Sequence, residues 1–242
     1  MLILLLSSTG CRIGGLPDLT FGSLTKIPEY GIYRITFYEN TNSEYYTYCT
    51  RECADTGIDA YLQFRQRFGE KITFNEDTQQ WQPSKSPLFR TQFDYNDSLQ
   101  VRQPKPMNIN SLRSTLAFHM VKCGLRVFEH PTVPKKINRV RKEIPLANGF
   151  RKFVISSFVR ARVRDDIRQK LVDHRGGYLD ESYLRLEESE ILQEYMKAES
   201  YLTIDPTVRL SQEVQTLRID KSRMEQMLDR ISTLENKILN ED

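Results

Sequence analysis

The first fifth of the chain alternates between apolar runs and polar breaks. Residues 1–6 are all apolar and Gly10 follows shortly, which predicts a core helix with a glycine stop. Residues 32–38 and 45–48 are rich in β-branched and aromatic side chains, as strands are. The polar segment 39–44 is expected to join these two strands as a hairpin.

The centre of the chain is punctuated by capping residues and prolines. Thr50 can cap a helix that stops at Gly69, and apolar residues at every fourth position predict another helix that ends at Gly124. Residues 70–108 contain several prolines and are expected to be rich in loops. Residues 126–145 are predicted to form a basic loop punctuated by proline.

The second half of the chain is mostly helical in pattern. Helices are expected at about 149–160, 164–173 and 187–199. Two strands followed mainly by helices predict a mainly α fold with a small antiparallel β-sheet, an α+β arrangement. We assign residues 1–204 to this domain and residues 205–242 to a separate amphipathic helix.

The final segment repeats apolar residues at alternating intervals of three and four. This spacing predicts either a coiled coil of about three to four heptads or a lone helix that packs on its own domain, and the pattern favours neither. Lys221 occupies one position of the seam. The apolar seam residues are Leu210, Val214, Leu217, Met224, Leu228 and Ile231.

Charge is concentrated in one part of the chain. The 242 residues have a net charge of only +3, but residues 135–170 hold twelve Lys or Arg against three acids, a local charge of +9. Such a stretch is typical of a phosphate-binding face, or of a basic surface that is merely solvated. The apolar start is too short to span a membrane, so no membrane partner is expected.

The four cysteines do not predict a metal or a disulfide framework. Cys49 and Cys53 are four apart, but no second Cys or His pair lies near them in sequence. Reduced, mostly buried thiols in a cytoplasmic protein are therefore expected. The abrupt start at a core helix indicates that an N-terminal portion is absent.

Four residues could carry chemistry when they are taken together. Arg12 follows the first helix and a glycine turn, and Arg151 lies in the first turn of a later helix. His174 ends a helix, and Tyr183 comes nine residues later. Taken singly, each has an ordinary explanation as a surface cation, a group that compensates a helix dipole, or a half-buried aromatic.

The conjunction resembles the tyrosine recombinase family of phage integrases and Xer-type enzymes, and most closely the integrase-like proteins of archaea. Arg12 ends a T-G-x-R turn, and Arg151 ends an H-x-x-R motif in which Asn148 stands for the histidine. The family's L-x-G-H segment is matched loosely by L-V-D-H, which ends at His174. Tyr183 follows at the interval that the family shows. The resemblance covers nearly the whole chain.

The resemblance implies a site-specific DNA recombinase that cleaves and rejoins double-stranded DNA through a 3′-phosphotyrosyl intermediate. Tyr183 would be the nucleophile, Arg12 and Arg151 would stabilise charge on the phosphate oxygens, and His174 would bind the phosphate or assist proton transfer. No metal or other cofactor is implied. Homo-oligomers on DNA, a cytoplasmic, nucleoid-associated location and a mobile-element origin are implied as well. The surface expected to hold the duplex backbone includes Arg160, Arg162, Arg164 and Arg168.

Three positions depart from the family pattern. Asn148 cannot titrate, and the hairpin 39–44 lacks the lysine that serves the family as general acid. Lys26 and Lys71 are the nearest alternatives. The acid often found three residues after the first arginine is Gly15 here. These departures leave a second hypothesis, a catalytically decayed DNA-binding remnant. A third is a helical interaction protein that assembles through its C-terminal segment.

Overall fold

The computed structural model describes residues 1–125, 145–173 and 186–239, and it divides into two compact units, Met1–Leu202 and Thr203–Asp242. The strands are β1 (Leu24–Ile27), β2 (Ile32–Phe37), β3 (Tyr45–Tyr48), β4 (Thr73–Asn75) and β5 (Gln80–Gln82). The helices are α1 (Leu2–Thr9), α2 (Ala60–Arg67), α3 (Ser98–Arg102), α4 (Ile109–Lys122), α5 (Asn148–Arg160), α6 (Asp165–Leu171), α7 (Glu188–Lys197), α8 (Glu199–Leu202) and α9 (Pro206–Leu239).

Within the described residues, the strands form two small antiparallel sheets. One sheet has the order β1-β2-β3, and β4 pairs with β5 in the other. The predicted mainly α fold with a small antiparallel sheet is therefore confirmed. Elements β1, β4, β5 and α3 were not predicted, because each has only three to five residues of mixed polar and apolar type and so shows no clear period.

The hairpin and the first capped helix form as predicted. Strands β2 and β3 pair directly, with Phe37 opposite Tyr45. The Thr50 hydroxyl accepts a hydrogen bond from the Cys53 backbone N–H at 3.2 Å, which caps the helix that follows. That helix starts at Arg51, is π-helical over Cys53–Asp59 and then continues as α2.

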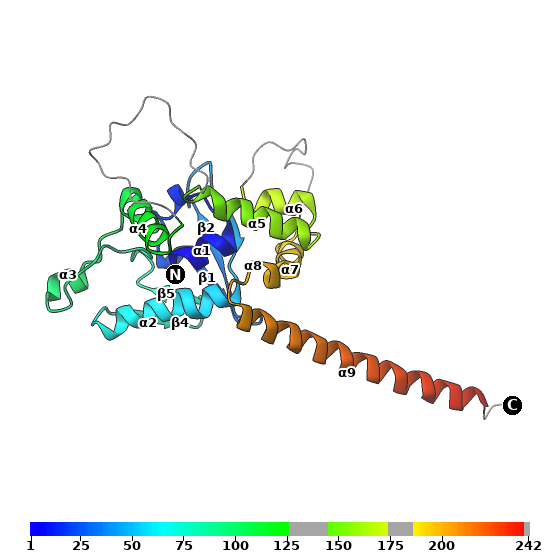
Figure 1. Ribbon diagram of the computed structural model, residues 1–242. Coiled ribbons are helices and arrows are strands. Elements are labelled where there is room, and N and C mark those ends of the chain that lie inside the picture. Colours follow the sequence, from blue (N-terminus) through cyan, green and yellow to red (C-terminus); the bar gives the residue numbers. More distant parts are fainter. Residues whose placement is uncertain (126–144, 174–185, 240–242) are drawn as a thin grey trace, which may run out of the picture. The chain divides into compact units, whose positions relative to one another are not determined.

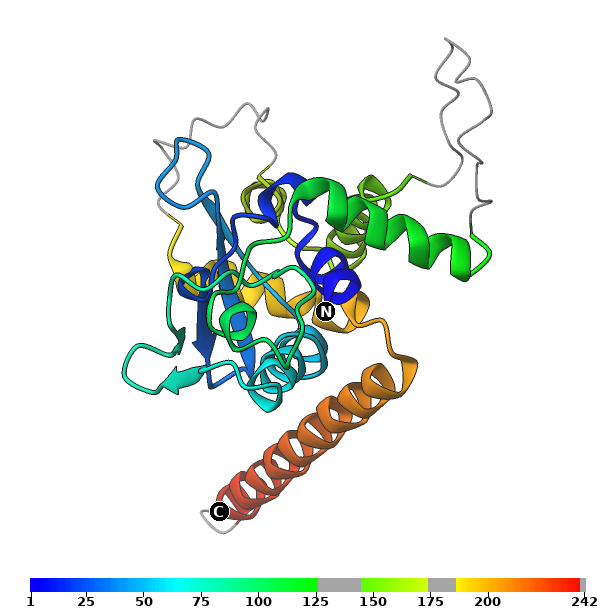
Figure 2. The same cartoon turned by 90° about the vertical axis from the view of Figure 1, so that its left-hand side faces the viewer.

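Helix α1 lies at the centre of the first unit, among the sheet, α4 and α5 (Figures 1 and 2). Leu5 and Leu6 are fully buried and belong to a cluster with Phe21, Ile35 and Leu116. Full burial of such a side chain stabilises a fold by about 1.5–3 kcal/mol. The apolar start of the chain therefore anchors the residues that follow it.

A second apolar cluster joins α5, α6 and α7 to the sheet. Val154 and Phe158 lie one turn apart on α5 and are fully buried, together with Ile167 of α6 and Tyr195 of α7. The Tyr195 hydroxyl also donates to the Ser8 carbonyl at 3.1 Å. The end of α1 is thereby tied to the helices that follow the basic segment of the chain.

The second unit consists largely of α9, which is 34 residues long. All six apolar residues of the predicted seam have exposed side chains, including Leu217 at 67% and Leu228 at 59%. These six side chains form an exposed apolar stripe along α9. Within the described residues, no helix is both long and apolar enough to cross a membrane.

Candidate active site

The first arginine of the predicted site lies just beyond the glycine that ends α1. Gly10 has φ +62°, and its N–H caps the helix by donating to the Leu6 carbonyl at 3.1 Å. This left-handed turn redirects the chain, so that Cys11 is buried and Arg12 is exposed. The T-G-x-R sequence therefore forms a helix stop that presents an arginine at the surface.

The same glycine allows α5 to approach α1 closely. A Cβ atom at Gly10 would lie only 3.0 Å from Val154 Cβ. The close approach brings Arg151, one turn earlier on α5, to the end of α1, where its Nη1 donates to the Gly10 carbonyl at 3.0 Å. Gly10 is thus required both for its φ angle and for the space it leaves.

Arg151 also reaches the C-terminal end of α6. Its Nη2 donates to the Val172 carbonyl, so one guanidinium group satisfies carbonyl oxygens at the ends of two helices. Burial lowers the pKa of Arg151, and the nearby charge of Arg12 lowers it further. The guanidinium group still remains charged at neutral pH, because its ordinary pKa exceeds 12.

The two arginines meet at Asp173, the residue that follows α6. Arg12 forms an ion pair with the Asp173 carboxylate, and its Nη2 donates to the Asp173 carbonyl at 3.0 Å. Arg151 Nη2 lies 3.4 Å from that same carbonyl oxygen. Two residues 139 positions apart in sequence thereby aim their guanidinium groups at a single oxygen atom.

Asp173 itself has a backbone conformation that favours glycine. Its φ is +49°, in the left-handed region that Asp and Asn tolerate better than other side chains do. Asp173 is the third residue of the L-V-D-H segment, so the segment turns at this residue through a conformation that glycine adopts more readily. Asp173 also supplies a carboxylate that pairs with Arg12.

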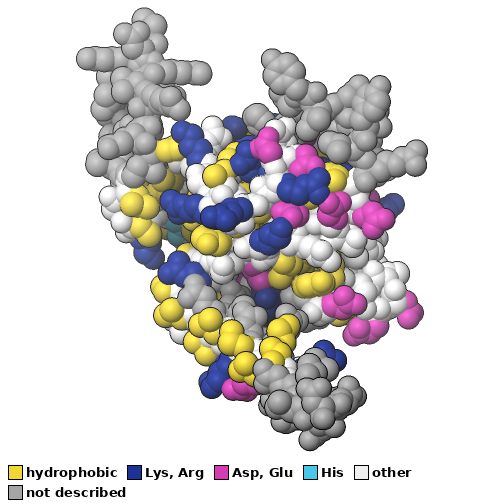
Figure 3. All heavy atoms as spheres, turned by 90° about the vertical axis from the view of Figure 1, so that its right-hand side faces the viewer, with side chains coloured by type: hydrophobic (Ala, Val, Ile, Leu, Met, Phe, Trp, Pro, Cys, Tyr) yellow, Lys and Arg dark blue, Asp and Glu magenta, His cyan; other side chains and the backbone are white. Residues whose placement is uncertain are grey.

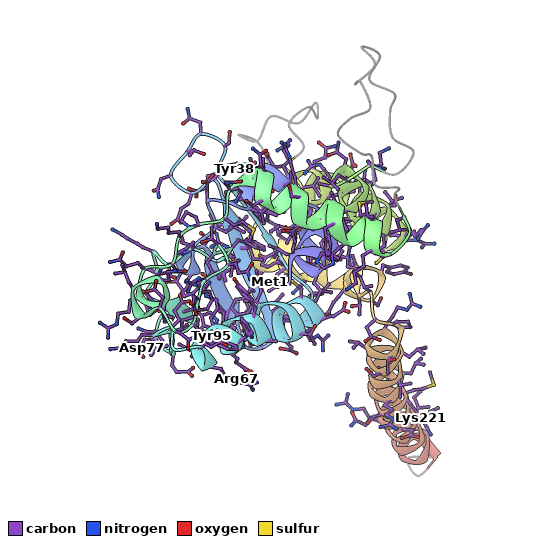
Figure 4. The ribbon with its side chains drawn as sticks, turned by 60° about the vertical axis from the view of Figure 1, so that its left-hand side comes forward. Met1, Tyr38, Arg67, Asp77, Tyr95 and Lys221 are labelled. Atoms are coloured by element: carbon purple, nitrogen blue, oxygen red, sulfur yellow. The ribbon has the colours of Figure 1, made fainter. Side chains whose placement is uncertain are left out.

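The missing acid at Gly15 has a steric explanation. A Cβ atom there would lie 3.1 Å from the Phe37 ring and 3.2 Å from the Tyr38 ring. Tyr38 lies where β2 leaves the sheet for the hairpin loop (Figure 4), and its φ is +53°. The Tyr38 ring therefore occupies the space that a side chain at position 15 would need, and Asp173 supplies the carboxylate for Arg12 instead.

The remaining predicted site residues are placed as follows. Asn148 is the first residue of α5 and is exposed, three residues before Arg151 on a neighbouring position of the helix surface. His174 and Tyr183 lie outside the described residues, as does nearly all of the predicted basic loop. The structure thus brings Arg12 and Arg151 together and puts Asn148 one turn away from Arg151.

Two further groups at this site are not among the predicted site residues. Tyr45, at the start of β3, has a buried phenol on which the charges of Arg151 and Asp173 act. Burial raises the pKa of the Cys11 thiol to about 12, so the thiol is protonated and a poor nucleophile at neutral pH. The one sequence signal for Tyr45 was its place directly after the hairpin that lacks a lysine.

The alternative lysine Lys26 is engaged elsewhere. Its Nζ lies 2.8 Å from an Asp59 carboxylate oxygen and 5.4 Å from the centre of the Tyr33 ring. Lys71 is exposed on the segment between α2 and β4.

The predicted basic surface is only partly available for phosphate. Arg164 pairs with Asp166 and Glu190, and Arg168 pairs with Asp165. Figure 3, which views the side of the molecule where α5, α6 and α7 lie, shows Lys and Arg side chains beside a group of Asp and Glu. Arg160 and Arg162 are exposed, and they form no ion pair with an acid in the described part of the chain.

The chain is similar to known proteins in structure but not detectably in sequence. No protein-family model and no curated protein matches the chain. Among solved structures, the chain is similar to the XerH site-specific recombinase bound to its difH substrate in a pre-cleavage complex. The TM-score is 0.45 and the identity 15%, over 72% of this chain and 39% of that chain. The chain therefore spans about two fifths of the length of that recombinase.

Proposed function

We propose that this protein is a DNA strand transferase of the tyrosine recombinase type. The observation that carries the proposal is the convergence of Arg12 and Arg151 on one oxygen atom, the Asp173 carbonyl. Planar guanidinium groups match the geometry of phosphate oxygens, and two of them can neutralise the charge that builds up as a phosphodiester is attacked. The order of the four residues along the chain, Arg12, Arg151, His174 and Tyr183, supports the same reaction.

In this mechanism the phosphate replaces the Asp173 groups as the ligand of both arginines. The Tyr183 oxygen attacks the phosphorus, so that a bond forms between them while the bond from phosphorus to the 5′ oxygen breaks. Tyr183 gives up its hydroxyl proton as it attacks, the leaving 5′ oxygen takes up a proton to become a hydroxyl, and rejoining reverses these steps. His174 hydrogen-bonds the phosphate or assists proton transfer, and the Asn148 amide can hydrogen-bond the phosphate but cannot titrate.

The partner that fits this chemistry is double-stranded DNA. Arg160 and Arg162 are exposed beyond the two site arginines and can contact the backbone of a duplex. Arg164 and Arg168 contribute less, since each is paired with acids. Binding should weaken steeply with salt, because each phosphate contact releases condensed counterions.

Strand exchange needs two duplexes and several protomers, so we also propose that the protein forms homo-oligomers on DNA. Residues 1–204 would perform the chemistry in the cytoplasm, at the nucleoid. Residues 205–242 would bridge protomers, because the apolar stripe of α9 is exposed. This assignment makes the C-terminal helix an assembly element and no part of the reaction site.

A second candidate function is DNA binding without strand transfer. The hairpin segment 39–44 has no lysine, and Lys26 is paired with Asp59. A chain without a general acid would hold the phosphate but release the 5′ oxygen slowly. The two candidates differ in a single observable, a covalent bond between protein and DNA.

Covalent trapping on DNA tests the proposal. Pooled random duplexes, each with a nick that lets the cleaved fragment diffuse away, are mixed with the protein at low salt and separated on a denaturing gel. Tyr183→Phe is compared with Tyr178→Phe, which removes a neighbouring phenol from the same segment. We expect an adduct with the wild type and with Tyr178→Phe, and none with Tyr183→Phe.

Two results contradict the strand-transferase proposal. An adduct that survives in Tyr183→Phe would assign the nucleophile to another residue. Salt-sensitive DNA binding without any adduct, in the wild type on every pool, would favour the DNA-binding remnant.

A further inference from the structure

Tyr45 lies in the sheet, packed against two aromatic neighbours. It is the first residue of β3, and its ring stacks on Phe37, the paired residue of β2, with ring centres 5.2 Å apart and an angle of 15° between the planes. The Tyr38 ring lies 6.3 Å away on the same hairpin. Helix α6, which ends just before Asp173, packs against the same strand. The position of the phenol is therefore set by the sheet and by two aromatic neighbours.

The Tyr45 hydroxyl is buried but has no hydrogen-bond partner among the described residues. Buried hydroxyl groups in proteins are nearly always hydrogen-bonded, since an unsatisfied one forfeits its bonds to water. The Thr47 hydroxyl, two residues along the same strand, shares this property. The lack of a hydrogen-bond partner therefore does not by itself indicate a ligand site. The residues around each hydroxyl show whether a ligand could bind there.

Tyr45 packs beside the arginine site. Its ring contacts the apolar cluster that contains Cys11, the residue before Arg12, and its strand β3 packs against both α1 and α6. Burial raises the pKa of Tyr45 above the ordinary value of a tyrosine. The phenol is therefore protonated at neutral pH and available as a hydrogen-bond donor. Arg12, Arg151 and the Tyr45 hydroxyl are all donors, so a ligand that satisfies the three must offer several acceptor oxygens.

We propose that the Tyr45 hydroxyl is a third hydrogen-bond donor to the phosphate that Arg12 and Arg151 bind. The inference rests on the proposed function, since it takes the arginine pair to be the phosphate site. It adds a residue that no motif of the chain identifies, and it gives the buried hydroxyl a partner that arrives with the substrate. Tyr45 acts here as a donor that stays protonated, a role distinct from that of the nucleophile.

Inorganic phosphate is the probe for this site. Thermal unfolding is followed at rising phosphate concentration, with chloride holding the ionic strength constant, for the wild type, Arg12→Ala, Tyr45→Phe and Thr47→Val. A ligand that binds the folded state raises Tm with its concentration, which yields an affinity. Thr47→Val is the matched control, because it removes a buried, unpartnered hydroxyl from the same strand.

We expect Tyr45→Phe to bind phosphate about tenfold more weakly, because a hydrogen bond to a charged group is lost. Without phosphate it should unfold at or above the wild-type Tm, since no hydrogen bond within the described protein is removed. Thr47→Val should bind phosphate as the wild type does. Arg12→Ala should bind it more weakly and so define the site.

The outcomes separate this inference from the proposed function. Weaker binding in Arg12→Ala with unchanged binding in Tyr45→Phe would overturn the role of Tyr45 and leave the arginine site standing. A lower Tm of Tyr45→Phe without phosphate would show that the hydroxyl serves the fold, and would also overturn it. Equal binding, or none, in the wild type and Arg12→Ala would refute the arginine site and the inference together.

Discussion

At the scale of single residues, the most deeply buried charges lie away from the arginine site. Arg65 is fully buried and donates to Glu70 Oε2 at 2.9 Å and to the Leu88 carbonyl at 3.0 Å. Arg90 donates to the same Glu70 oxygen at 2.6 Å. Two arginines thus share one carboxylate, and removal of that carboxylate would leave two buried cations uncompensated.

Glu70→Gln should therefore destabilise the fold by about 3 kcal/mol at neutral pH. Although burial raises the pKa of Glu70, the hydrogen bonds and charges of Arg65 and Arg90 outweigh it and lower the pKa below the ordinary value. A lowered folded-state pKa stabilises the fold above the unfolded-state pKa of about 4.3, and this contribution is lost as pH falls. Urea unfolding of both proteins should show their difference shrinking below about pH 4.

A control for this prediction is Glu76→Gln, which changes an exposed glutamate in the turn between β4 and β5. Its unfolding free energy should stay close to that of the wild type at every pH. A Glu70→Gln deficit that stays constant down to pH 2 would contradict the ionic account of the pair.

Asp173→Asn should bind DNA more tightly than the wild type. The Asp173 carboxylate occupies the Arg12 guanidinium, whose side chain is 47% exposed, and so competes with phosphate. An ion pair of this kind contributes about 1 kcal/mol in water, so its removal should raise the affinity for DNA roughly fivefold. Asparagine tolerates the left-handed backbone, so the turn should survive.

Fluorescence anisotropy of a labelled duplex at several salt concentrations measures the effect of Asp173→Asn. Asp77→Asn makes the same change of net charge away from the site, in the turn that joins β4 to β5 (Figure 4). An equal gain in affinity from both variants would mean that only net charge matters.

Site residues that belong to local motifs could be predicted from the sequence, whereas those brought in by tertiary packing could not. Arg12 and Arg151 belong to motifs whose local turns can be read directly, a glycine stop and a first helical turn. Asp173 and Tyr45 join the site only because α6 packs against β3 and β3 packs beside α1, and that is a property of tertiary structure. No local pattern encodes the meeting of two guanidinium groups at one carbonyl.

At the scale of elements, long or strongly patterned segments were predictable. The core helix at the start, the strands of the hairpin and the helices with glycine stops lie close to their expected positions. Strand β1 and the β4–β5 pair escaped prediction, because they are short and mix polar residues with apolar ones. Strand β3 is as short as β1, but its four residues are all aromatic or β-branched. The helix expected after Thr50 forms, but a π-helical start is not visible in side-chain spacing.

Gly10→Ala should reveal how α1 and α5 hold the site together. The positive φ costs an alanine about 1–2 kcal/mol, and its Cβ would also press on Val154 at 3.0 Å. Gly124→Ala is the matched control, because Gly124 also has a positive φ, +72°, but nothing lies within 4 Å of a Cβ atom built there. Urea unfolding should show a larger loss for Gly10→Ala. Equal losses would mean that the approach of the helices contributes nothing.

At the scale of the whole molecule, the apolar stripe of α9 predicts self-association. Leu217→Glu with Leu228→Glu places two charges in the seam and should reduce the oligomer to monomers in sedimentation velocity. Met227→Glu changes an equally exposed apolar residue outside the seam spacing and should leave assembly intact. If the wild-type protein is monomeric both free and on DNA, α9 does not bridge protomers as proposed.

The central claim is that Arg12 and Arg151 hold one phosphate during strand transfer. A double-mutant cycle on the single-turnover rate of adduct formation tests it most directly, with Arg12→Ala, Arg151→Ala and the double variant. We expect each single variant to lose about two orders of magnitude, and the double variant to lose far less than the product, since residues that act as a unit are not additive. Losses that multiply, or an arginine whose removal leaves the rate unchanged, would contradict the claim.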